Sequence, residues 1–187
     1  MLQNYPRCVA VTLDYEGGND DDPRDPGGRT SRGITQYEWD RYRRAYHGAV
    51  LPADVWDAPQ SQVENIYRAN YWNAVAGDQW AVGLDLCVFD LGVNSGPAKA
   101  LKIAHAAMTH PIGGFGELAL LSTVIKDRVT VIKRYQARRL SFLQSLTIWR
   151  TFGRGWGRRV RGIEAIATKW ALADIGLPRG CEGKAFV

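Results

Sequence analysis

The sequence predicts a mainly α-helical protein. Thr35 and Glu38 have the three-residue spacing of a capping box, in which each residue satisfies a free backbone N–H of the other at the start of a helix. The pair Gly17-Gly18 follows an apolar stretch and gives a helix a place to end. Evidence for strands is thin, and it allows only a short β-ribbon around the acidic loop that follows the glycine pair. With 187 residues, the chain can bury a core of its own.

Residues 5–15 fit two interpretations. Apolar side chains alternate there as in a strand, whereas Pro6 suits the first turn of a helix. We favour a helix that ends at Glu16, because the glycine pair directly after it can take the backbone conformations that end helices.

Two further helices are predicted before residue 84. The capping box begins a helix over about 36–47, for which Gly48 provides the stop. Asp57 and Gln60 resemble a second cap, and we expect a helix from there through about Tyr71.

The second half also reads as helices. Residues 84–93 are mostly apolar, and Asn94-Ser95-Gly96-Pro97 breaks the chain before an alanine-rich helix at 98–108. Further helices are expected at about 117–124 and from Asp127 to about Leu146. We expect Arg154-Gly155-Trp156-Gly157 to interrupt the chain before a last helix near 158–174, and no periodic pattern follows Gly176.

The net charge of +5 hides an uneven distribution. Residues 1–95 carry 8 Lys/Arg and 14 Asp/Glu, whereas residues 96–187 carry 16 and 5. A basic half of this kind favours a polyanionic partner, which can be nucleic acid, an anionic membrane surface or the bacterial cell wall; simple solubility is the alternative. Arginines such as Arg138, Arg139, Arg158, Arg159 and Arg161 fit either a solvated helix face or attraction to the wall or a membrane.

Neither a metal nor a disulfide framework is indicated. Cys8, Cys87 and Cys181 are odd in number and widely spaced, and the three histidines share no ligand spacing with them. We therefore expect no cofactor. The first fifteen residues lack the features of a signal peptide, and no apolar stretch is long enough to span a bilayer. These features predict synthesis in the cytoplasm and no stable membrane insertion.

The segment with the most candidate functional residues is the acidic loop, which follows Glu16, extends to Thr35 and contains Asp25 and Thr30. Its five glycines and two prolines exclude a regular helix or a long strand, so it reads as an ordered loop that presents two carboxyl groups and a hydroxyl. Glycoside hydrolysis needs one protonated and one ionised carboxyl group. A partly buried Glu16 would suit the acid, Asp25 the base or charge stabiliser, and Thr30 would hold a water molecule.

Structural interpretations of the same residues stay open. Asp20-Asp21-Asp22 fits a solvated turn or, less well, a calcium site, since the loop lacks the EF-hand pattern. Asp25 before Pro26 can simply start a turn, and Glu16 can be an exposed helix end. Each structural interpretation is credible alone. That all three hold at once, for residues in this order along the chain, is much harder to accept.

These residues resemble a known family. Glu16-Gly17-Gly18, followed by Asp22-Pro23-Arg24-Asp25-Pro26-Gly27-Gly28-Arg29-Thr30 and Gly33-Ile34-Thr35, looks like the N-terminal motif of glycoside hydrolase family 108, a group of bacterial and phage N-acetylmuramidases. The order Glu, Asp, Thr is also similar to the phage lysozyme triad, with four residues here between Asp25 and Thr30. The resemblance implies a lysozyme-like helical fold with Glu16 as the essential acid and Asp25 and Thr30 as its partners. Where the family often has an aromatic residue after the glycine pair, this chain has Asn19-Asp20.

A second block agrees with the first. The segment Phe89-Asp90-Leu91-Gly92-Val93-Asn94-Ser95-Gly96-Pro97 is similar to the start of the family's C-terminal region, often called a predicted peptidoglycan-binding domain. Later landmarks of that region are resembled by Arg138-Arg139 and by Gly155-Trp156 with Arg159. Seven tryptophans and eight tyrosines exceed what a core needs, so some are expected to line a binding cleft. We assign Asn94, Tyr37 and Trp156 to substrate binding, with a helix cap as the structural alternative for Asn94.

The sequence thus predicts a motif-bearing catalytic lobe at 1–83 and a basic, peptidoglycan-binding lobe at 84–187, packed as one monomeric unit. The expected activity is that of a muramidase of the lysozyme type, cleaving the β-1,4 bond between N-acetylmuramic acid and N-acetylglucosamine. A lytic transglycosylase and a non-catalytic wall-binding or phage-like structural module are the alternatives. A nucleic-acid-binding protein would explain the basic half, but no reading motif supports it.

The expected partner is peptidoglycan. Because no signal peptide is seen, action in the periplasm or cell wall would follow release, through a holin as for a bacteriolytic phage endolysin, or delivery as part of a phage-like particle.

Overall fold

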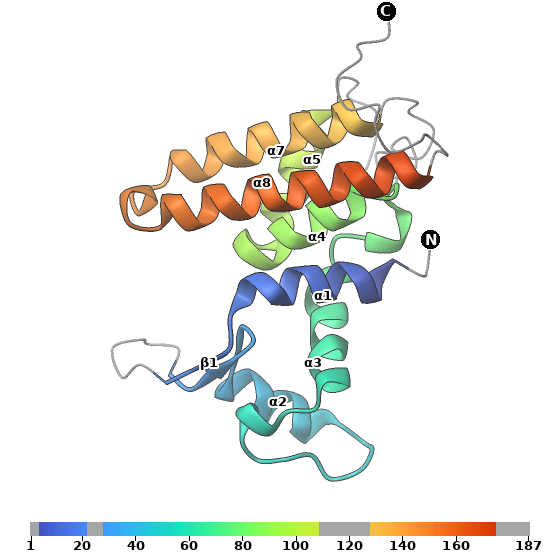
Figure 1. Cartoon of the computed structure of the whole chain (residues 1–187). Helices are drawn as coiled ribbons and strands as arrows, with labels where there is room; N and C mark the ends of the chain where they lie inside the picture. The colour runs from blue at the N-terminus through green and yellow to red at the C-terminus, as the bar shows by residue number, and fades with distance from the viewer. Residues whose placement is uncertain (1–3, 22–27, 109–127, 175–187) are drawn as a thin grey trace, which may run out of the picture. The chain divides into compact units, whose positions relative to one another are not determined.

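The computed structural model describes residues 4–21, 28–108 and 128–174, and Figure 1 shows their helices and strands. The chain forms two compact units, one made of Pro6–Asn70 and the other of Met1–Tyr5 with Tyr71–Val187. Each unit is described by itself below. Helices dominate both, as the sequence predicts.

The first unit begins with helix α1 (Tyr5–Glu16). Pro6 occupies its first turn, where the missing N–H costs nothing. Helix α1 ends at Glu16, and Gly17 takes a left-handed backbone conformation with φ +82° that a side chain would make costly. The helical interpretation of residues 5–15 is therefore confirmed, and the strand alternative is wrong.

A small antiparallel sheet follows α1, in the order β1-β2-β3. Its strands have two residues each and are β1 (Asn19–Asp20), β2 (Thr30–Ser31) and β3 (Ile34–Thr35). Thr30 pairs with Asp20 on one side and with Thr35 on the other. Since paired residues point to the same face of a sheet, these three side chains share one face, and the buried Ser31 lies on the opposite one. The β-ribbon allowed around the acidic loop is thus present.

Helix α2 (Gln36–Ala45) starts at the predicted capping box: the Glu38 N–H donates to the Thr35 hydroxyl, and the Thr35 N–H donates to the Glu38 carboxylate. The next predicted cap is wrong. Asp57 ends the short 3₁₀ helix η1 (Val55–Asp57), which Asp54 caps instead. Helix α3 (Gln60–Tyr67) begins after Pro59 without a side-chain cap. A π-helical turn, η2 (Arg68–Trp72), continues it.

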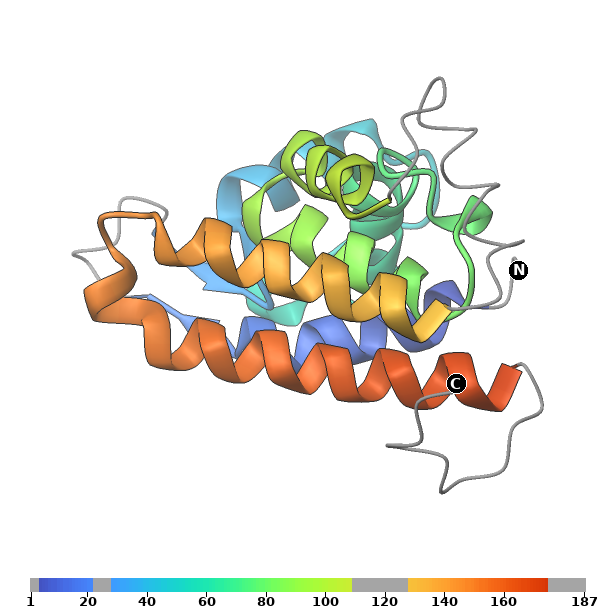
Figure 2. The same ribbon diagram turned by 90° about the horizontal axis from the view of Figure 1, so that it is seen from above.

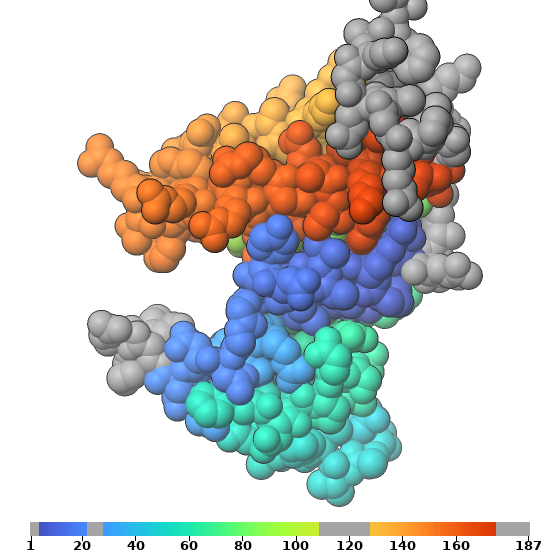
Figure 3. All heavy atoms as spheres, viewed as in Figure 1, coloured from blue at the N-terminus to red at the C-terminus, as the bar shows by residue number. Residues whose placement is uncertain are grey.

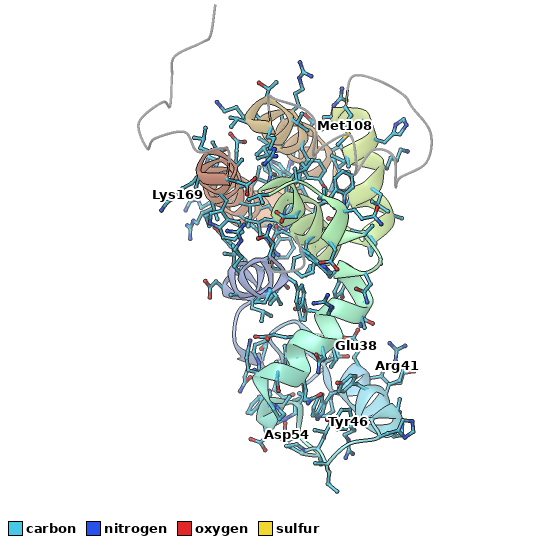
Figure 4. The ribbon with its side chains drawn as sticks, turned by 90° about the vertical axis from the view of Figure 1, so that its right-hand side faces the viewer. Glu38, Arg41, Tyr46, Asp54, Met108 and Lys169 are labelled. Carbon is cyan, nitrogen blue, oxygen red and sulfur yellow. The ribbon has the colours of Figure 1, made fainter. Side chains whose placement is uncertain are left out.

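Aromatic and aliphatic side chains form the core of the first unit. Trp39 of α2 is fully buried, and its indole N–H donates to the Pro52 carbonyl at 2.9 Å. Further core residues of this unit come from α1, β3, η1 with the residue after it, and α3: Cys8, Val9, Ile34, Val55, Ala58, Val63, Ile66 and Tyr67. Figure 4 shows Glu38, Arg41 and Tyr46 on or beside α2 and Asp54 before η1, which are polar positions around this core.

Helix α4 (Leu84–Ser95) is the centre of the second unit. It contacts α5 (Pro97–Ala107), α7 (Arg128–Gln144) and α8 (Trp149–Asp174), and the short η3 (Gly77–Gln79) precedes it. This enclosure explains why residues 84–92 are buried on every side and why the segment reads as almost continuously apolar. Helices α7 and α8 run antiparallel, side by side, as Figures 1 and 2 show.

The two acids that interrupt the apolar run of α4 are buried and fully used. Asp85 accepts hydrogen bonds from the Asn4 amide at 2.6 Å and from two backbone N–H groups. Asp90 binds Arg159 through both carboxylate oxygens and Arg139 at 2.7 Å. Burial alone would raise the pKa of Asp90, but the two arginines outweigh it and the pKa lies below its ordinary value. Placing Arg139 and Arg159 on a solvated or wall-attracting face was therefore wrong.

The expected break at Arg154-Gly155-Trp156-Gly157 is also wrong, since α8 runs through it without interruption. One glycine nearby has a packing role instead. A methyl group on Gly153 would lie 2.6–3.0 Å from the Trp149 ring, whereas one on Gly157 would be in ordinary contact with the Arg161 side chain at 3.4 Å. Contacts with neighbouring helices stabilise the helix enough to offset the low helix propensity of glycine.

Several expectations fall outside the described residues or stay predictions. The helix at 117–124, the tail after Gly176 and Cys181 lie outside the described ranges. Cys8 and Cys87 are both buried, and burial raises the pKa of the Cys87 thiol. The division into lobes at 83/84, and a peptidoglycan-binding role for the second lobe, stay predictions. In the described part of the chain, no helix is long and apolar enough to cross a membrane.

Candidate active site

The site is built around Glu16, the last residue of α1. Its side chain is half-buried and lies against the turn between β2 and β3. A methyl group on Gly33 would be 3.2 Å from the Glu16 Oε2 atom and 3.6 Å from its Cβ. The helix end thus places the carboxyl group directly beside the hairpin.

The hairpin turn itself consists of Arg32 and Gly33. Ser31 pairs with Ile34 across it, and both central residues have positive φ, +49° for Arg32 and +75° for Gly33. This is the conformation of a type I′ turn, whose twist matches that of the strands it joins. Gly33 meets two requirements, because its φ disfavours a side chain and there is no space for a Cβ beside Glu16.

Tyr67 of α3 lies on the same turn. Its hydroxyl group donates a hydrogen bond to the Arg32 carbonyl at 2.7 Å, and the tyrosine is 2 % exposed. A methyl group on Gly33 would lie only 2.5 Å from this hydroxyl oxygen. The Tyr67 hydroxyl and the Glu16 carboxyl group therefore lie next to the same point of the glycine backbone.

Thr30 precedes this turn on β2 and is half-buried. Its hydroxyl donates to the Gly28 carbonyl at 2.8 Å. A hydroxyl group has one proton and two lone pairs, so in this arrangement the oxygen can still accept a hydrogen bond. Thr30 is thus part of the small sheet, and Glu16 lies beside the turn of the same sheet at Gly33, three residues after Thr30.

A second set of contacts fixes the start of β2. Arg29 pairs with Asp54 through two hydrogen bonds of 2.9 and 2.6 Å and contacts Asp21 at 3.3 Å. Its guanidinium lies 3.5 Å from the ring centroid of Trp56, whose indole N–H donates to the Thr30 carbonyl at 3.1 Å. The hydrogen bond from Arg29, with a smaller contribution from the Trp56 backbone N–H, lowers the pKa of Asp54. This network orients the strand that carries Thr30.

Two other predicted site residues belong to the same part of the sequence. Asp25 lies outside the described residues. Tyr37 is in the first turn of α2, with 72 % of its surface exposed, so its ring is open to solvent. The roles of both stay predictions.

Asn94 and Trp156 belong to the second unit. Asn94 lies within α4, where its side-chain oxygen accepts from the Ser95 hydroxyl at 3.2 Å. It does not cap the next helix, because Gly96 occupies that position. Trp156 stacks on Phe152 with ring centroids 5.8 Å apart and lies 6.3 Å from Trp149. Their assignment to substrate binding stays a prediction.

The aromatic cluster lies near the turn between α7 and α8, which is at the surface in Figure 3. Phe152 is 52 % exposed and Ile148 is 50 % exposed. Within the described ranges, no three His, Cys, Asp or Glu side chains gather as the ligands of a metal ion would.

Sequence reasoning missed three contributors to the site: Arg32, Gly33 and Tyr67. The pattern Ser31-Arg32-Gly33-Ile34 contained a signal, because glycine between short polar-apolar alternations favours a two-residue hairpin. Tyr67 gave no such signal, since it lies 35 residues from its partner Arg32 and reads as an ordinary core residue of a helix.

Comparison with known proteins agrees with this geometry. The family model described as glycosyl hydrolase 108 matches residues 9–96. The matched region contains Glu16, the acidic loop, the hairpin and all of α4. No curated protein matches the chain.

A solved structure extends the likeness beyond the family region. The structure of Brucella abortus SagA is 28 % identical to this chain, with a TM-score of 0.73, and the match covers 91 % of this chain and 97 % of that one. The resemblance to family 108 seen in the sequence is therefore confirmed, as is the mainly helical, lysozyme-like fold. At this level the protein is a glycoside hydrolase, and the two comparisons support peptidoglycan as its substrate.

Proposed function

We propose that the protein is an N-acetylmuramidase that cleaves the β-1,4 bond between N-acetylmuramic acid and N-acetylglucosamine, with Glu16 as general acid. The observation that carries the proposal is the position of Glu16. Its carboxyl group lies at the end of α1 against the β2–β3 hairpin, within the region that matches the glycosyl hydrolase family. A carboxyl group on rigid elements beside a small sheet is suited to donate a proton to a bound glycosidic oxygen.

In the proposed reaction, Glu16 gives its proton to the oxygen of the leaving sugar while positive charge develops on the ring that is left behind. The Thr30 hydroxyl donates its proton to the Gly28 carbonyl, so its oxygen can accept a hydrogen bond from the attacking water. The water oxygen bonds to the anomeric carbon as the bond to the leaving sugar breaks, and Asp25 takes the proton of the water or stabilises the developing charge. Exchange with solvent returns this proton to the carboxylate of Glu16 for the next cycle.

Wall attraction is assigned to the exposed arginines of the second unit. Arg138, Arg158 and Arg161 are exposed, so they remain available to the anionic groups of the wall. Arg139 and Arg159 are occupied by Asp90 and take no part.

We further propose that the protein acts as a monomer on peptidoglycan, after synthesis in the cytoplasm and either release through a holin or delivery in a phage-like particle. The absence of a recognisable nucleic-acid-reading motif and the family match favour the wall as the polyanionic partner.

The test is digestion of purified peptidoglycan by the wild type and by Glu16→Gln, which removes the acidic proton and hardly changes the volume. General acid catalysis contributes roughly 10²–10⁴-fold, so the variant should lose about that much activity while it folds normally. Glu64→Gln is a suitable control, since this half-buried glutamate of the same unit lies on α3 and its carboxylate accepts a bond from Gln60. Substantial activity in Glu16→Gln would contradict the assignment.

A further inference from the structure

The backbone of Arg32 has the left-handed conformation that the turn requires, but this conformation is unfavourable for an arginine. At φ +49° it is one of two non-glycine residues with positive φ in the described chain. Asparagine or glycine would occupy this position of a type I′ turn at lower cost. Strained backbone of this kind gathers at functional sites, where the surrounding contacts hold it in place.

Those contacts use the backbone and the side chain of Arg32 together. Its N–H donates to the Gly18 carbonyl at 3.2 Å, which ties the turn to the segment that leaves α1. Its guanidinium donates to the Ala58 carbonyl at 2.7 Å and to Gln60 at 2.8 Å, which ties the turn to the start of α3. Arg32 thus connects the end of the helix that carries Glu16 to the helix that carries Tyr67.

Tyr67 completes the arrangement from the other side. Its hydroxyl proton is donated to the Arg32 carbonyl, which fixes the oxygen against the backbone of Gly33. The Glu16 carboxyl group borders the same glycine. Any movement of the turn or of the tyrosine hydroxyl would therefore change the space in which the carboxyl group lies.

We propose that Arg32 and Tyr67 are positioning residues, which hold the turn at Gly33 and through it the carboxyl group of Glu16. The proposal rests on the proposed function, because it assigns these residues a part in the reaction of Glu16. In this proposal the position of the general acid depends on contacts with the turn and with Tyr67, and not only on its place at the end of α1.

Two variants test it. Arg32→Asn suits the left-handed conformation and removes the guanidinium contacts, and Tyr67→Phe keeps the buried ring and removes the hydroxyl. We expect each to lower kcat about tenfold on soluble glycan fragments with KM nearly unchanged, because small displacements of a catalytic group cost up to about 100-fold. Tyr42→Phe is the matched control: its hydroxyl donates to Gln62 at 2.6 Å in the same unit, and its loss should leave kcat unchanged.

The Glu16→Asp background separates positioning from general damage. Aspartate withdraws the carboxyl group by one methylene, so Tyr67→Phe should cost less than about twofold there if it acts through Glu16. An equal tenfold loss in both backgrounds would overturn the proposal, as would full kcat in the folded Tyr67→Phe and Arg32→Asn variants. If Arg32→Asn fails to fold, Tyr67→Phe still decides. A wild type inactive on every glycan would overturn the proposed function together with this inference, whereas an active wild type with unchanged variants would overturn the inference alone.

Discussion

The buried ion cluster of the second unit gives the most quantitative prediction. Asp90→Asn would leave Arg139 fully buried and Arg159 9 % exposed at the side chain, without the carboxylate that both now bind. Breaking a buried pair by removing one partner costs about 3–5 kcal/mol. The asparagine oxygen can still accept one of the arginine bonds, so we expect the lower end, about 3 kcal/mol. For a chain of this length, that corresponds to a loss of roughly 6–12 °C in Tm.

Urea and thermal unfolding of the wild type and Asp90→Asn would measure this loss. The control is Asp174→Asn, because Asp174 also pairs with an arginine of α7, Arg128, but is 42 % exposed. An exposed pair contributes about 0–1 kcal/mol, so the control should unfold almost like the wild type. Equal stabilities of the two variants would refute the energetic argument for the buried cluster.

The pH dependence gives an independent check on Asp90. The pKa of Asp90 is lowered in the folded protein. Its ionised carboxylate therefore stabilises the fold fully above the unfolded pKa of about 3.9, and this stabilisation is lost as the pH falls through the folded pKa. The difference in stability between the wild type and Asp90→Asn should therefore be constant near neutral pH and shrink below about pH 4. A difference that stays the same at low pH would contradict the assigned pKa shift.

Two further predictions concern α8. Gly153→Ala should destabilise the protein, because the new methyl group meets the Trp149 ring at 2.6 Å. Gly155→Ala has open space around the new methyl group and should stabilise the protein by about 0.5–1 kcal/mol. Thermal unfolding compares the two variants, and equal effects would refute the packing role of Gly153. Arg158→Gln should weaken binding to purified cell walls at low salt and leave folding intact, whereas Arg159→Gln should lower Tm; cosedimentation at several salt concentrations and thermal unfolding distinguish them. Unchanged wall binding by Arg158→Gln would count against the basic surface.

Local signals in the sequence predicted local structure well. The capping box at Thr35 and Glu38 started a helix where expected, and Gly17 ended α1 at Glu16. Both depend on backbone groups within a few residues, so the chain needs no distant partner to make them. The short strand of Thr30 lies in the acidic loop, where a β-ribbon had been allowed, and its partners Thr35 and Asp20 are five and ten residues away.

The errors arose where distant contacts decide the outcome. The glycines around Trp156 suggested a break, yet the contacts of α8 with α7 and α4 keep the helix continuous through them. Arg139 and Arg159 looked like surface charge, and their partner Asp90 is 49 and 69 residues away. No periodicity reveals which of several arginines meets a buried acid.

The same limit applies to the site. The motif pointed to Glu16, because a glutamate before two glycines at a helix end is a local feature. Tyr67 and the guanidinium contacts of Arg32 are set by the way α3 packs on the hairpin, so only the structure revealed them.

The central claim is that Glu16 acts as the proton donor in the cleavage of muramyl bonds. The most direct test is mass spectrometry of the fragments that the wild type and Glu16→Gln release from purified peptidoglycan. The account predicts reducing muramic-acid ends from the wild type and none from Glu16→Gln. Anhydro-muramic ends would identify a lytic transglycosylase, and reducing ends in equal yield from both proteins would contradict the role of Glu16. No fragments from either protein would favour a wall-binding module without catalytic activity.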